Sequence, residues 1–206
     1  MKEYTFYKLR LRPAILEEAQ RCFAQYGIRA VRMDDISKNL GISKRTVYEL
    51  YDTKEDLLCE VVTAWQEVRD KRLQELSARC DDTMDLLIGA LSLQLETAAT
   101  TNFNFFKDII KYPKVAKAVK EYSDKQYAYS SQFFAKGVDE GYFISSVDYD
   151  VFNRVVYSTM EMLRTDDRYD NLDYKSLFRG YLYVMVRGLC TPKGMEKIDK
   201  FVEENL

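Results

Sequence analysis

The sequence of 206 residues contains no histidine. Its absence excludes the most common general base, the Ser-His and Cys-His nucleophilic pairs, and the Glu-x-x-His motif of di-iron helix bundles. None of the eight glycines forms a GxG pattern, so the usual phosphate-cradling loops are also missing. We therefore expect a protein that is not an enzyme and that has no catalytic residues and no cofactor.

The sequence also has few cysteines and no long apolar run. The four cysteines, at positions 22, 59, 80 and 190, include no CxxC pair, which favours reduced thiols over a disulfide frame or a metal site. No apolar run is long enough to cross a bilayer, and Met1–Arg12 is too polar for a signal peptide. We expect a cytoplasmic protein with no membrane partner.

Only three prolines interrupt the chain, at positions 13, 113 and 192, and no strand-like alternation occurs. This pattern predicts an all-α fold. From residue 54 onward we expect helices over residues 54–79, 82–100, 102–111, 113–140, 148–165, 174–190 and 193–204.

The stretch Met33–Tyr51, MDDISKNLGISKRTVYELY, has the spacing of a helix-turn-helix. Ser37 is small enough for the crossing of two short helices, and Gly41 suits a turn that needs positive φ. The apolar positions on either side of that glycine predict a buried wedge formed by Ile36, Leu40, Ile42, Val47 and Leu50.

The second of these helices opens with donor-rich side chains. Ser43 is the expected N-cap, and Lys44, Arg45 and Thr46 follow in the first turn. Such an N-terminal end suits insertion into the major groove of DNA. The alternative is a helical hairpin whose cations simply face solvent.

A preceding amphipathic helix, ILEEAQRCFAQYG, is expected to start at Pro13 and to stop at Gly27. Its expected buried face is made of Ile15, Ala19, Cys22, Phe23 and Tyr26.

Together with ISKNLGIS and YELYDTKEDL, that helix resembles the N-terminal DNA-binding domain of the TetR family of bacterial transcriptional repressors. The departures are Ser37 for the family's alanine, Tyr51 for its phenylalanine, and Arg32 for a threonine that often caps the second helix and touches a phosphate. The resemblance implies a three-helix DNA-binding domain with a helix-turn-helix, at residues 1–53, and a larger helical ligand-binding and dimerisation domain at residues 54–206.

The charge distribution agrees with a DNA reader in the N-terminal part. Residues 1–48 carry a net charge of +5 and the remaining residues −7. Four basic residues, at positions 2, 8, 10 and 12, form an arm that would reach the DNA backbone or a minor groove, or else a solvated tail. We expect Lys44, Arg45 and Thr46 to read base edges beside Ser43, and the phosphate contacts to come from Arg32, Tyr48, Tyr51 and Lys54.

Residues 151–163 and 177–190 are apolar almost all round, so each of these helices needs cover on two sides. The resemblance implies a homodimer held by a four-helix bundle, which would match a palindromic operator. The alternative is a monomer whose last helix covers the second face. The expected dimer contacts are Val155, Ser158, Met162, Gly180, Tyr183 and Arg187.

The middle helices are rich in aromatic residues, which form either a filled core or a pocket for an aromatic or hydrophobic small molecule. The candidate pocket residues are Trp65, Gln94, Thr97, Phe103, Phe106, Tyr112, Tyr127 and Phe134. The sequence as a whole predicts a ligand-responsive, homodimeric DNA-binding regulator, a repressor released from its palindromic double-stranded operator by a small-molecule effector. The alternative function is a helical protein-interaction adaptor with a vestigial hairpin.

Overall fold

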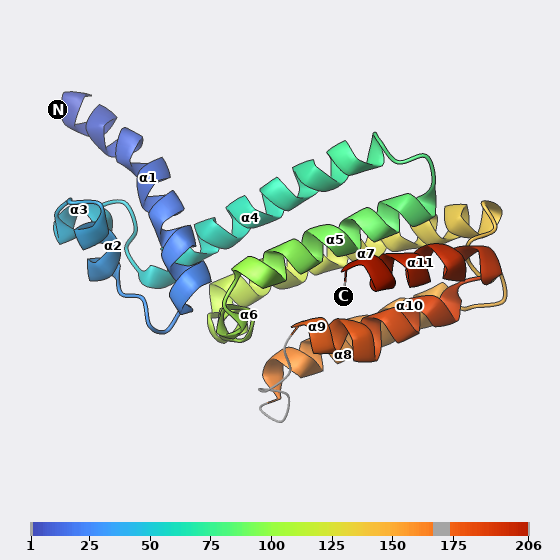
Figure 1. The fold of residues 1–206 in the computed structure, drawn as a ribbon. Helices are drawn as coiled ribbons and strands as arrows, with labels where there is room; N and C mark the ends of the chain where they lie inside the picture. The colour runs from blue at the N-terminus through green and yellow to red at the C-terminus, as the bar shows by residue number, and fades with distance from the viewer. Residues whose placement is uncertain (1, 167–173, 206) are drawn as a thin grey trace. The chain divides into compact units, whose positions relative to one another are not determined.

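A computed structural model of the chain describes residues 2–166 and 174–205 (Figure 1). Side chains are described from Arg10 onward, apart from those of residues 103, 164, 174 and 175. The all-α prediction is confirmed, since the described residues form helices and a single isolated bridge, between Phe143 and Cys190. None of the helices in these ranges has both the length and the apolarity needed to cross a membrane.

The helices from residue 54 onward lie close to their predicted bounds. The predicted helix over residues 174–190 differs in containing a π-helical turn. In chain order the elements are α1 (Lys2–Tyr26), α2 (Met33–Asn39), α3 (Lys44–Tyr48), α4 (Lys54–Ser77), α5 (Thr83–Thr100), α6 (Phe103–Asp108), the 3-10 turn η1 (Ile109–Lys111), α7 (Pro113–Asp139), α8 (Tyr149–Thr165), α9 (Tyr174–Leu177), the π-helical turn η3 (Phe178–Leu182), α10 (Tyr183–Leu189) and α11 (Pro192–Asn205).

Helix α1 corrects two predictions. It begins at Lys2, so Pro13 lies inside the helix and does not open it. No breaker precedes that proline, and its ring removes one backbone donor from a helix already under way. Tyr26, expected on the buried face, is 53% exposed, because Gly27 ends the helix at φ +81° and Ile28 enters the core in its place.

The chain divides into two compact units. Unit 1 comprises residues 1–69 and 100–122, and unit 2 comprises residues 70–99 and 123–206. In unit 1 a single hydrophobic core joins α1, α2, α3 and the start of α4 to α6, η1 and the start of α7. Its buried members include Phe23, Ile36, Leu57, Phe105 and Val115. The functional boundary between residues 53 and 54 stays a prediction.

Polar contacts reinforce this core where α6 and α7 begin. The backbone N–H of Asn102 donates to the carbonyl of Ala24 at 2.7 Å, near the C-terminal end of α1. The carboxylate of Asp108, on α6, is buried and pairs with Arg29 at 3.0 Å. Helices α2 and α3 therefore share one folded unit with a segment that lies far along the chain.

Unit 2 contains most of α5, the later part of α7, and α8 to α11. Its core is strongly aromatic, with Phe134 stacked on Tyr149 at 4.5 Å between ring centroids and Phe143 packed beside them. Helix α11 is attached by an ion pair, since Lys197 lies 2.7 Å from both Asp82 and Asp85.

Candidate nucleic-acid interface

The turn between α2 and α3 has the geometry that the sequence predicted. Gly41 adopts φ +65°, in the left-handed region that glycine enters without steric cost. Its N–H donates to the carbonyl of Lys38 at 3.1 Å, and the N–H of Ile42 donates to Ser37 at 3.0 Å. This pair of bonds is a Schellman motif, which ends α2 and sets the direction of the chain into α3.

The wedge between the two helices is also confirmed. Ile36 and Val47 are fully buried, and Leu40, Ile42 and Leu50 pack against the same core. Ser37 is buried at the crossing, where its hydroxyl donates to the carbonyl of Asp34 at 2.8 Å. The small polar side chain is therefore satisfied within its own helix.

Ser43 caps the N-terminus of α3, as predicted. Its Oγ accepts the backbone N–H of Thr46 at 3.1 Å and lies 2.8 Å from the hydroxyl of the same residue. A capped first turn holds the following cations in place on a helix of only five residues.

Lys44 and Arg45 are exposed and lie next to carboxylates. The ammonium of Lys44 is 2.8 Å from both oxygens of Asp34, and this hydrogen bond raises the pKa of the lysine. It also lies over the ring of Tyr48, 5.7 Å from the centroid. Arg45 is 87% exposed, and its Nε donates to Glu49 at 3.0 Å.

Arg32 occupies the N-cap position of α2 without capping it through its side chain. A guanidinium has no acceptor, so the carboxylate of Asp35 instead accepts the backbone N–H of Arg32, at 2.7 Å. The side chain of Arg32 is exposed.

Tyr51 is buried and Lys54 is half-buried. Tyr51 is 3% exposed, and burial raises its pKa to about 12. Lys54 donates to the backbone carbonyl of Ile28, and burial lowers its pKa. Both residues support the core of unit 1, and their predicted contacts with DNA stay a prediction.

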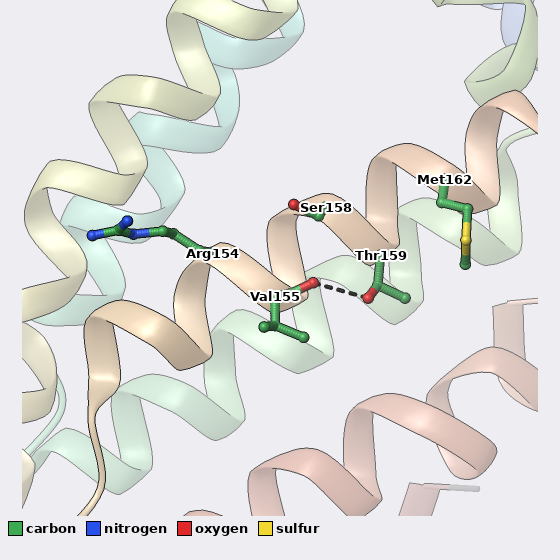
Figure 2. Close-up of a pocket in the computed structure, with 5 residues that line it drawn as sticks. All are labelled: Arg154, Val155, Ser158, Thr159 and Met162. Carbon is green, nitrogen blue, oxygen red and sulfur yellow. Dashed lines mark hydrogen bonds between the residues drawn. The ribbon is translucent and has the colours of Figure 1, made fainter.

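The predicted dimer residues of α8 lie on an uncovered stripe. Val155 is 50% exposed, and Ser158 and Met162 are exposed one and two turns further on. With Arg154 and Thr159 they line a surface hollow of about 290 Å³ (Figure 2). Because its lining comes from one helix, this hollow marks an uncovered face and does not enclose a ligand.

A second stripe runs along η3 and α10. Gly180, Val184 and Gly188 are all exposed, and a Cβ added at either glycine would meet nothing within 4 Å. The other two dimer candidates bind within the chain: Tyr183 and Arg187 each donate to Asp199 of α11, at 2.8 Å.

The predicted ligand residues are divided between the units. Trp65, Phe106 and Tyr112 pack against the core of unit 1, where Trp65 lies 4.5 Å from Phe105 between ring centroids. In unit 2, Phe134 belongs to the aromatic core, Tyr127 donates to the carbonyl of Asp150 at 3.4 Å, and Gln94 and Thr97 are exposed. The side chain of Phe103 lies outside the described residues.

Four residues that bear on these surfaces were missed from the sequence. Glu49 follows Arg45 at the i,i+4 spacing of helical ion pairs, which is a usable signal. Val151 lies one turn before Val155 and is likewise exposed, as is Val184 on α10. Asp34 gave no signal, because its contact with Lys44 crosses the turn between two helices.

Comparison with known proteins identifies the helix-turn-helix region. The family model described as "bacterial regulatory proteins, tetR family" matches residues 15–61. An "uncharacterized HTH-type transcriptional regulator", YhgD of Bacillus subtilis (strain 168), is 32% identical over 71 residues, which is 34% of each chain. The matching segment thus spans about a third of the length of that relative.

Solved structures extend the similarity of fold to nearly the whole chain. A TetR-family transcriptional regulator from Marinobacter aquaeolei VT8 has a TM-score of 0.71 at 17% identity, over 94% of this chain and 97% of its own. The ketosteroid transcriptional regulator KstR2 of Mycobacterium tuberculosis has a TM-score of 0.58 at 21% identity, over 87% and 95%. Residues 15–61 therefore match the tetR family of bacterial regulatory proteins, and the chain shares the fold of these solved structures over most of its length.

Proposed function

We propose that the protein is a DNA-binding transcriptional regulator that acts as a homodimer on a palindromic operator. The observation that carries this proposal is the first turn of α3, where Ser43 caps the helix and Lys44 and Arg45 project from a short helix fixed by a Schellman turn. A rigid helix end rich in donors is what reading of the major groove requires.

Within this interface, Lys44, Arg45 and Thr46 would contact base edges, and Arg32 and Tyr48 would contact phosphates. Ser43 would contribute through its cap. Tyr51 would support the reader from inside the core of unit 1, and Lys54 would reach a phosphate with a donor that its bond to Ile28 does not use.

The proposed dimer interface consists of the two uncovered stripes in unit 2. Val151, Val155 and Met162 on α8, with Val184 on α10, are large apolar side chains in contact with water. Gly180 and Gly188 leave room for the close approach of another helix. A two-fold axis through such a surface would present two readers to successive major grooves.

We further propose that a hydrophobic or aromatic effector bound in unit 2 releases the protein from its operator, which makes the protein a repressor. KstR2, whose fold is similar, is described as a ketosteroid regulator, which supports an effector of this kind. The rings of Phe134, Phe143 and Tyr149 pack on one another, so a ligand would have to separate them.

Selection of the purified protein against a random duplex library tests the central proposal. A palindromic consensus at near-physiological salt supports a dimeric operator-binding protein. If no duplex is enriched even at low salt, DNA reading is refuted and the adaptor function gains support. An effector would then be sought by its ability to weaken operator binding, and operator DNA must weaken effector binding by the same factor.

A further inference from the structure

Both exposed cations at the start of α3 have an acidic partner within the same fold. Arg45 donates through Nε to Glu49, one turn further along the helix, at 3.0 Å. Lys44 lies 2.8 Å from each carboxylate oxygen of Asp34, which comes from α2. The surface proposed to meet a polyanion therefore carries two carboxylates among its cations.

We propose that Glu49 and Asp34 are positioning residues that direct Arg45 and Lys44 toward base edges and away from phosphates, which raises sequence specificity. The inference rests on the proposed DNA-binding function and names two of its determinants. Neither acidic residue is required to touch DNA.

The bond to Glu49 determines which part of Arg45 is available. It engages Nε, at the inner side of the guanidinium, and leaves the two terminal amino groups at the outer end of an 87% exposed side chain. Those two groups form the fork that binds O6 and N7 of guanine in a bidentate manner. Glu49 thus holds the guanidinium so that its two terminal amino groups are the ones available to a base edge.

Asp34 acts on Lys44 through charge. A phosphate that approaches this ammonium also approaches the negative charge of Asp34, so the encounter gains less than it would from a lysine surrounded only by salt ions. The carboxylate then remains close to the DNA backbone and repels it. Binding to any phosphate is weakened, whereas an acceptor on a base edge carries no net charge and is repelled less by Asp34.

Stability does not account for these two pairs. Both cations are mostly exposed, and exposed ion pairs add little to the free energy of unfolding. Glu49 follows the last residue of α3, at the C-cap, where a negative charge is unfavourable to the helix dipole. Glu49 therefore slightly destabilises α3 at a position where its carboxylate binds Arg45.

The test compares Glu49→Ala, Glu49→Gln and Asp34→Asn with the control Glu17→Gln, which removes one negative charge from an exposed position on α1. Each variant is selected on the random library and then titrated with its best duplex, with that duplex mutated at each guanine, and with an unrelated duplex at several salt concentrations. Unfolding curves show that each variant is folded.

We expect Glu49→Ala to reduce the preference for one guanine about tenfold. Glu49→Gln should keep that preference, because its amide oxygen still accepts from Nε. Asp34→Asn should tighten binding to the unrelated duplex severalfold more than the control does, with a steeper salt dependence.

Three outcomes overturn the inference while leaving DNA binding established. The first is equal effects of Glu49→Ala and Glu17→Gln on base preference. The second is a consensus that has no guanine whose preference depends on Glu49, and the third is an Asp34→Asn variant that matches the control on the unrelated duplex. A wild-type protein that binds no duplex instead refutes the proposed function itself.

Discussion

Lys197 places its ammonium 2.7 Å from the carboxylate of Asp82, a residue 115 positions earlier in the chain. The same carboxylate accepts the hydroxyl of Tyr142 at 2.6 Å. Three segments of unit 2 therefore meet at one half-buried acidic group: the connection before α5, the connection after α7, and α11.

The contacts of Asp82 with Lys197 and Tyr142 predict that the free energy of unfolding falls in acid. Burial alone would raise the pKa of Asp82, but the bonds from Lys197 and Tyr142 outweigh it and lower the pKa to about 2. A carboxylate with a lowered pKa stabilises the fold above its unfolded value near 4, and that contribution is lost as the pH falls from about 4 to about 2. We expect Lys197→Met to cost about 1 to 2 kcal/mol at pH 7.

Urea unfolding at pH 7 and across the acid range measures this effect. The control is Lys200→Met, because Lys200 is also on α11 but lies 3.9 Å from an exposed glutamate. Equal losses of unfolding free energy in the two variants would show that the bond between Lys197 and Asp82 adds no specific stability.

The uncovered stripe on α8 predicts the effect of a charge placed there. Val155→Glu should leave the monomer folded and prevent dimerisation, because a carboxylate buried in an interface without a partner is strongly unfavourable. Val68→Glu is the matched control, since the two valines are 50% and 52% exposed. Light scattering after size exclusion should give a monomer for the first variant and a dimer for the second, and a dimer for both would refute this interface.

The cap at Ser43 can be separated from any contact that it makes with DNA. Ser43→Ala removes the acceptor for the N–H of Thr46 and should cost about 1 kcal/mol. Ser43→Asp keeps a good cap and should retain stability, while its negative charge weakens DNA binding. Unfolding curves and duplex titrations on both variants measure the two effects, and a loss of stability in Ser43→Asp would contradict the role of the cap.

Lys54 offers a test between a structural and a phosphate-binding role. Lys54→Met keeps an apolar side chain of similar length but removes the bond to Ile28 and the ammonium that lies 5.8 Å from the ring centroid of Phe23, so it should lower the stability of unit 1. If Lys54 makes no phosphate contact, the slope of log affinity against log salt concentration stays unchanged. A slope reduced by about 1 would support the phosphate contact that the sequence predicted for Lys54.

Local rules accounted for most of the fold. Gly27 and Gly41 were expected at helix ends, and both take positive φ there, because few other residues adopt that conformation. The rules failed at Pro13, where the preceding residues contain nothing that stops a helix. They also failed at Tyr26, which lies in the helix as expected but is exposed, because the helix ends there and Gly27 turns the chain away.

The candidate sites were less predictable because they depend on contacts between distant segments. No spacing rule links Lys44 with Asp34 across a turn, or Arg187 with Asp199 on the following helix. The aromatic residues grouped as one pocket divide between two units, since periodicity shows that a side chain is buried without showing in which core it lies.

Unit 1 is built from two separate stretches of the chain, and this affects when it can fold during synthesis. The helix-turn-helix leaves the ribosome early, but Phe105, Ile109 and Val115 complete its core and are synthesised only after the whole of α5. Because domains fold as units during synthesis, we expect the nascent helix-turn-helix segment to expose the apolar faces of α1 and α4 until those later residues emerge. A chain cut short before residue 100 would contain every residue of the helix-turn-helix and still lack part of the core that holds it together.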